Sequence, residues 1–306
     1  MLRCGVMIGS IPIQYYALEP DHLLFYFERL PPDERHGKKL RTGENWLLTG
    51  DHLGFPSIHP SGGVEILIYR HAEDTLYLEH LDKNGKQLSL ISLKKLDQEG
   101  ILSGGYPVLF AATSFHRNWI ALIDPPKRRD GKSGVNLRIE RLTENQISHP
   151  EDSLTIPIYS DLLSYSEIPV AWHPERSCIY FTNPKGEVVL LDMETRTQEE
   201  IADGIFCGLV PQTHKILVQD GEKNFSILDT ITRAQEKVQM PIKLDNQFLY
   251  SILPLPGGER IFYVTARFHL LMEDATNLWS ANVDGSELKK IGKSRNSSFR
   301  DFRFVE

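Results

Sequence analysis

Three histidines are the residues of this chain whose type and spacing could do chemistry. His59, His116 and His173 are evenly spaced, and each lies in a short polar stretch between two apolar segments. Neutral imidazole is the commonest metal ligand among protein side chains. Three imidazoles at equivalent positions of a repeated unit could meet at one ion and support a metal-assisted lyase or hydrolase.

The alternative is that these histidines have a structural role. His59 and His173 each precede a proline, in a turn where a polar side chain commonly bonds the nearby backbone. No carboxylate lies at a fixed offset from all three histidines to orient their rings. Arg117 directly follows His116, and its cation would oppose a bound divalent ion. The structural interpretation predicts no stoichiometric metal and no cofactor.

One basic cluster could bind an anion. It lies in the stretch 125–132 and contains Lys127, Arg128 and Arg129. Such a cluster could contact phosphate or an acidic partner, or it could be a solvated loop between two strands. Together with Arg117 and the three histidines, these residues are the candidate ligand-binding positions of the sequence.

Two familiar catalytic motifs are missing from the sequence. No G-x-S-x-G is present, so a nucleophile elbow of the α/β-hydrolase type is not predicted. Gly131, Lys132 and Ser133 resemble the end of a phosphate-binding loop, but Pro126 stands where that motif needs its first glycine.

Composition and charge narrow the class of partner. The chain of 306 residues is 41% hydrophobic and 25% charged, with a net charge of −7. This acidic balance argues against an extended nucleic-acid surface and against an anionic membrane, and no apolar run is long enough to span a bilayer. Three widely spaced cysteines give no disulfide or zinc pattern, so we expect reduced thiols and a cytoplasmic location.

The elements that must position these residues are short strands separated by turns. Each unit contains a turn, mostly with proline, followed by a strand rich in Ile, Tyr and Phe that reads as buried on both faces. The predicted strands are 22–28, 64–70, 118–123, 178–182, 215–219 and 260–265. Most successive turns are separated by about 40 to 50 residues, the length of a propeller blade. Two intervals are longer and place insertions at 92–106 and 148–167. The one helical pattern, at 160–165, is short.

The clearest unit lies near the C-terminus. Residues 277–291 read as strand, turn and strand, with Asp284-Gly285 at a turn that favours positive φ. The pattern L-W-x-x-N-x-D-G-S in this stretch, and the turn that runs from Trp172 to Phe181, resemble the TolB-type, WD-like β-propeller repeat. The resemblance implies a propeller of four-stranded blades, a fold that hosts both enzymes and binding modules.

The sequence therefore predicts an all-β protein, with residues 1–306 forming one β-propeller domain. Six blades are expected, with seven as the alternative. The alternating aromatic and charged residues of 299–305 are expected to form a strand that closes the ring against the N-terminal blade. We expect a non-enzymatic platform whose loops bind a protein or a small ligand, and the metal-assisted lyase or hydrolase remains the alternative.

Overall fold

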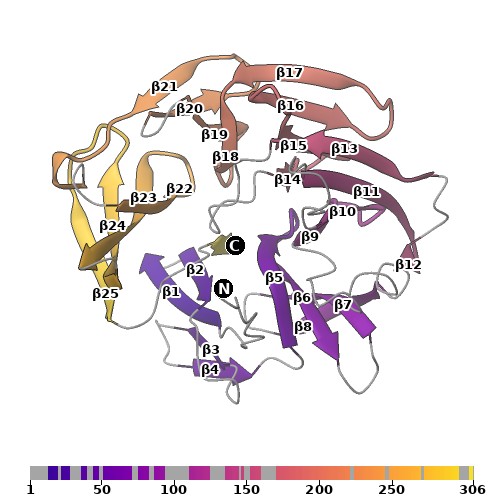
Figure 1. The fold of residues 1–306 in the computed structure, drawn as a ribbon, viewed down its shortest axis with the longest axis horizontal. Helices are drawn as coiled ribbons and strands as arrows, with labels where there is room; N and C mark the ends of the chain where they lie inside the picture. The colour runs from indigo at the N-terminus through magenta and orange to yellow at the C-terminus, as the bar shows by residue number, and fades with distance from the viewer. Residues whose placement is uncertain are drawn as a thin grey trace, which may run out of the picture.

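The structure is a computed structural model. It describes residues 13–19, 22–27, 36–39, 44–47, 51–70, 75–82, 86–93, 110–124, 135–144, 146–147, 152–159, 170–220, 224–244, 248–269, 272–295 and 303–305. For 13–47 and 303–305 it describes the backbone of the strands. These strands form five sheets arranged in a ring around a central axis (Figure 1).

The first sheet joins the two ends of the chain. Its spatial order is β26-β2-β1-β3-β4, and β2 pairs antiparallel with both β1 and β26, with Leu23 opposite Val305. The strands are β1 (Ile13–Glu19), β2 (His22–Phe27), β3 (His36–Lys39), β4 (Glu44–Leu47) and β26 (Arg303–Val305). Ring closure by the whole of 299–305 stays a prediction, because 299–302 lie outside the described residues.

The second sheet has nine strands and contains two antiparallel runs. The first run is β5-β6-β7-β8 and the second is β9-β10-β11-β13. Parallel contacts join them, at Phe55 opposite Phe110 and, through β12, at Ser92 opposite Gln146. The strands are β5 (Asp51–Ile58), β6 (Val64–Arg70), β7 (Thr75–Leu81), β8 (Gln87–Ser92), β9 (Phe110–Thr113), β10 (Trp119–Asp124), β11 (Val135–Thr143), β12 (Gln146–Ile147) and β13 (Leu154–Ile158).

The last three sheets are four-stranded antiparallel meanders, in which each strand pairs with the next along the chain. Their strands are β14 (Val170–Trp172), β15 (Cys178–Thr182), β16 (Glu187–Asp192) and β17 (Gln198–Asp203); β18 (Ile205–Leu209), β19 (Lys215–Gln219), β20 (Phe225–Asp229) and β21 (Gln235–Val238); β22 (Phe248–Pro254), β23 (Arg260–His269), β24 (Met272–Asn282) and β25 (Lys289–Arg295). A 3-10 turn, η4 (Ile242–Leu244), lies between β21 and β22.

The core lies between the sheets. All five residues of β15 are buried, as expected for a strand that is covered on both faces, whereas three of the first four residues of β17 are exposed. One apolar cluster packs β9–β11 and β13 against β14–β16, a second packs β15–β17 against β18–β20, and a third packs β18–β21 against β22–β24. The ring of small sheets is a β-propeller, and within the described residues no helix is long and apolar enough to cross a membrane.

The number of sheets corrects the expected count of blades. The described strands form five sheets, not six or seven, because the two parallel contacts merge two four-stranded runs, together with β12, into one nine-stranded sheet. The predicted insertion at 148–167 also contains β13, the outer strand of the second run. The other insertion falls almost wholly outside the described residues, as does the short helical pattern at 160–165.

The predicted hairpin at Asp284-Gly285 is confirmed. Gly285 has a φ of 78°, and its N–H donates to the carbonyl of Asn282 at 2.9 Å. The Asp284 carboxylate accepts the N–H of Ser286 at 2.9 Å. A side chain at position 285 would meet the carbonyl of Gln239 at 2.9 Å, so both the positive φ and the close neighbour favour glycine.

Candidate functional site

His59 is a backbone acceptor in the turn between β5 and β6. Its side chain is buried, and Nδ1 accepts the N–H of Ser61 at 3.1 Å. We therefore assign the ring proton to Nε2, which has no hydrogen-bond partner among the described residues. The Ser114 backbone lies near enough to favour the protonated ring, although without hydrogen-bond geometry. Burial, followed by the charges of His80 and Arg117, lowers the pKa of His59 to about 3.

His173 repeats this arrangement in the turn between β14 and β15. Its Nδ1 accepts the N–H of Glu175 at 3.1 Å, again two residues along the chain. Its own N–H donates to the carbonyl of Cys178 at 2.7 Å, which closes the turn. Burial, followed by the nearby Arg176, lowers the pKa of His173 to about 4. Both histidines are thus neutral at physiological pH, with Nδ1 used by a backbone donor.

His116 does not occupy the equivalent position, which corrects the sequence interpretation. In the turn between β9 and β10, the residue that closes the turn is Ser114, whose N–H donates to the carbonyl of Trp119 at 2.9 Å. Its hydroxyl accepts the N–H of Trp119 at 3.2 Å, much as the imidazole does in the other turns. His116 lies two residues further on and is exposed, edge-on to Phe115.

Among the residues that the structure describes, no group of three or more His, Cys, Asp or Glu side chains is arranged to hold a metal ion. The basic positions Lys127, Arg128 and Arg129 lie outside the described residues. Of the predicted basic candidates, the structure places only Arg117, and it places it in a network that the sequence did not predict.

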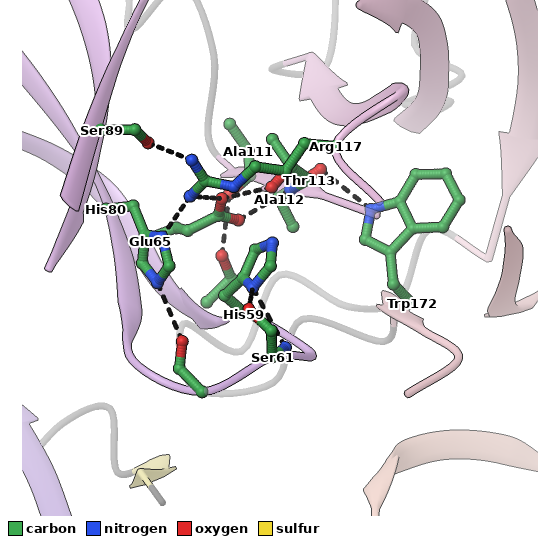
Figure 2. A network of polar contacts seen from close by, with 12 residues as sticks. His59, Ser61, Glu65, His80, Ser89, Ala111, Ala112, Thr113, Arg117 and Trp172 are labelled. Atoms are coloured by element: carbon green, nitrogen blue, oxygen red, sulfur yellow. Dashed lines mark hydrogen bonds and ion pairs between the residues drawn. The ribbon is translucent and has the colours of Figure 1, made fainter. Parts of the chain in front are cut away.

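That network is centred on Glu65, a buried carboxylate on β6 (Figure 2). Its side chain is 0% exposed. From the second run, Thr113 donates its N–H to Oε2 at 2.7 Å and its hydroxyl to Oε1. The guanidinium of Arg117 lies 4.0 Å from Oε1. The carboxylate of one run therefore receives its main partners from the other run.

Arg117 reaches across from the β9–β10 turn with a backbone in the left-handed region, at a φ of 55°. Its guanidinium donates to the hydroxyl of Ser89 on β8 and to Nδ1 of His80 on β7. Because a guanidinium only donates, Nδ1 of His80 carries no proton. The ring proton is then on Nε2, which donates to the carbonyl of Gly62 at 2.8 Å.

The side chains that contact the Arg117 guanidinium lie in one row across the strands of the first run. Glu65 is paired with Ser57 on β5 and with His80 on β7, and His80 is paired with Ser89 on β8. Ser57 donates its hydroxyl to the carbonyl of Ala111 in the second run at 3.0 Å. Each of the four strands thus contributes one polar side chain at the same level of the sheet.

Burial dominates the protonation of this row. It raises the pKa of Glu65 to about 7, against the bonds from Thr113 and the charge of Arg117, which favour the carboxylate. Burial also lowers the pKa of His80, and Arg117 lowers it further, whereas the Gly62 bond and Asp82 raise it. The row therefore holds a carboxylic acid that titrates near neutral pH beside a neutral imidazole.

Ser61 and His59 have the geometry of a nucleophile and a base. Ser61 is exposed, and its hydroxyl lies 2.6 Å from Nδ1 of His59. The same nitrogen already accepts a backbone N–H, however, and its pKa of about 3 makes it a weak base at neutral pH. The pair therefore fits a turn bond better than a catalytic dyad.

A neighbouring contact is buried and joins two sheets. Trp172, at the end of β14, donates its indole N–H to the carbonyl of Ala112 on β9 at 2.9 Å (Figure 2). Trp119 is also buried, and Trp279 donates to the hydroxyl of Thr265 at 3.0 Å. These three tryptophans pack or hydrogen-bond within and between sheets. The side chain of Trp46 lies outside the described residues.

Comparison with known proteins supports the fold alone. No family model and no curated protein sequence matches the chain. A puromycin-hydrolyzing peptidase of Mycobacterium tuberculosis superposes with a TM-score of 0.52 and 9% identity, over 92% of this chain and 46% of that one. An acylaminoacyl peptidase gives 0.52 and 9%, over 97% of this chain and 51% of that one. The chain thus spans about half the length of these structures.

TolB from Acinetobacter baumannii is also matched, at 12% identity over 97% of this chain and 66% of that one. Its TM-score of 0.48 is too low to argue from. The TolB-type resemblance seen in the sequence is confirmed at the level of the β-propeller fold, which the ring of sheets displays directly.

Proposed function

We propose that this propeller is a non-enzymatic binding module whose partner is another protein. The observation that carries the proposal is a pair of exposed apolar side chains at the connection from β21 to β22. Ile242 is 86% exposed and Phe248 is 55% exposed. Large apolar side chains exposed at a protein surface are typical of interaction sites. Ile242 lies in the connection and Phe248 is the first residue of β22, and the connections between strands are where folds of this kind commonly bind partners.

The assignment of the histidines supports the same proposal. Nδ1 of His59 and of His173 is used by a backbone N–H, and His116 is outside the equivalent position. These roles are those of turn residues and need no substrate. A cytoplasmic location is also part of the proposal, and it is supported by Cys178 and Cys207, which form no disulfide among the described residues.

The test compares two variants of the full chain in a quantitative pull-down from the native host. We expect I242S/F248S to lose the proteins that the wild type enriches. Ile231, which is 69% exposed on the turn between β20 and β21, provides the matched control, and I231S should retain them. Equal enrichment by the double variant and the wild type would contradict the proposal.

One observation favours a second candidate, a hydrolase. The exposed Ser61 hydroxyl lies within hydrogen-bond distance of His59, as noted above. The matched structures carry peptidase names, but at 9% identity they transfer only a fold. Labelling with a fluorophosphonate probe decides between the two. A label on Ser61 that disappears in S61A and in H59Q would favour the hydrolase, and we expect no label.

A further inference from the structure

We propose that Glu65, His80 and Arg117 form a proton-sensitive latch between the two runs of the nine-stranded sheet. Arg117 belongs to the second run, and all three of its side-chain partners belong to the first. The latch is closed when its guanidinium bonds His80 and Ser89 beside an ionised Glu65. It opens when protons remove the groups that attract the guanidinium. This inference is independent of the binding role proposed above.

The geometry makes His80 one of the two switches. Nδ1 of His80 accepts from the guanidinium, while Nε2 donates to Gly62. A proton added to His80 must go to Nδ1, the nitrogen that faces Arg117. It would replace a lone pair by an N–H and place two cations in contact. The bond to Arg117 therefore exists only with a neutral His80.

Glu65 is the second switch, and it acts in the same direction. Its ionised form attracts the guanidinium that lies 4.0 Å away, and its protonated form does not. The carboxyl keeps its two bonds to Thr113 in either form, because a hydroxyl can also accept. Acid thus weakens the hold on Arg117 through both groups, while the backbone contact between the runs persists.

Among the described residues, the other titratable groups that act on the latch are His59 and Asp82. From each packed element, the groups that face the latch are Ser57 on β5, Asp82 beyond β7, Ser89 on β8, Thr113 on β9 and His59 in the β5–β6 turn. The ring of His59 lies against the ring of His80, tilted by 33° and with ring centroids 4.6 Å apart. Its pKa, lowered by burial to about 3, keeps it neutral wherever the latch works. Asp82 favours a charged His80 and so helps the latch to open in acid.

The turn that carries Arg117 is the part that an open latch would release. The side chain of Arg117 is 24% exposed, so water can solvate the guanidinium once it leaves the row. Its backbone has a φ of 55°, a conformation that costs free energy in a residue other than glycine. The contacts of the guanidinium help to offset this strain, and their loss removes that support.

Hydrogen–deuterium exchange on the full chain tests the latch. We expect the segment 110–124 to exchange roughly three- to fivefold faster at pH 5.5 than at pH 8, after correction for intrinsic rates. In R117Q the segment should exchange at the faster rate at both pH values. In E65Q the pH effect should shrink to the part that His80 causes. The turn 255–260 in the last sheet serves as an internal control and should show no such change.

Any of three results would overturn the latch. One is equal corrected exchange of the wild-type segment at the two pH values. Another is a pH effect that persists unchanged in R117Q. Should R117Q fail to fold, R117K keeps the charge without the planar fork and should show a reduced pH effect. The wild-type comparison can decide the proposal without any variant. Slower corrected exchange of segment 110–124 at pH 5.5 than at pH 8 would also contradict the latch.

Discussion

The carboxylate of Glu65 accepts the backbone N–H of Thr113 at 2.7 Å, across the junction between two four-stranded runs. The Thr113 hydroxyl donates to the same carboxylate, and both residues are fully buried. Replacing Thr113 by Val keeps the shape and removes one donor from a buried acceptor. We expect T113V to lower the free energy of unfolding by about 1–3 kcal/mol. Urea denaturation measures this loss, and T113S, which keeps the hydroxyl, should lose less.

The stability of the protein should fall as Glu65 ionises. Its folded pKa of about 7 stands above the ordinary value of 4.5. The contribution of protonated Glu65 to the free energy of unfolding is therefore fully present below pH 4.5 and is lost as the pH rises through 7. E65Q, which is neutral at every pH, should gain on the wild type over this window by on the order of a few kcal/mol. A difference between E65Q and the wild type that stays constant with pH would contradict the raised pKa.

His59 and His173 should set an acid limit on stability. Their folded pKa values, about 3 and about 4, lie below the ordinary value of 6.5. Their contribution to the free energy of unfolding is complete above pH 6.5 and is lost as the pH falls toward these two pKa values. H59Q and H173Q should each flatten the decline of the melting temperature between pH 6.5 and 4. H116Q, at an exposed position, should show the same melting temperatures as the wild type across this pH range. The triple variant H59Q/H116Q/H173Q should keep partner binding.

The purified protein should carry no stoichiometric metal. The histidines that suggested a metal site use Nδ1 for turn bonds, and His116 lies away from the equivalent position. Elemental analysis of the protein from cells grown with ordinary trace metals checks this. One transition metal per chain that is lost in the triple Gln variant would contradict the structural role of the histidines.

Deleting residues 299–306 should promote aggregation. β26 pairs with β2, and its removal would leave an unpaired strand edge in the first sheet. Light scattering on heating compares the truncated protein with the full chain. A truncated protein that remains as monodisperse and as heat-stable as the full chain would rule out a closing role for this strand.

The strands could be predicted from the sequence because each is a short apolar run between turn residues. Predictions at 64–70, 178–182 and 215–219 coincide with β6, β15 and β19. The number of sheets could not be predicted, because two parallel contacts between separate runs leave no local pattern. Pairing of this kind depends on how whole sheets meet and not on neighbouring residues.

The candidate site was only partly predictable. His59 and His173 were assigned to turns correctly, but His116 was aligned with them because its turn has no proline to mark the position, which Ser114 occupies. Glu65 did carry a signal, an acidic residue inside the apolar run 64–70. A carboxyl side chain on a strand that is buried on both faces is shielded from water. It therefore needs a hydrogen-bonding or charged partner elsewhere in the protein. The sequence does not reveal that the partners are Thr113 and Arg117.

The pairing of β26 with β2 has a consequence for synthesis in the cell. Leu23 is synthesised long before Val305, so the edge of β2 that β26 covers has no partner until Val305 has left the ribosome. Contacts between such distant positions also form slowly, because a long loop must close first. Nascent chains of this protein should therefore depend on chaperones that shield the edge of β2 until β26 has been made.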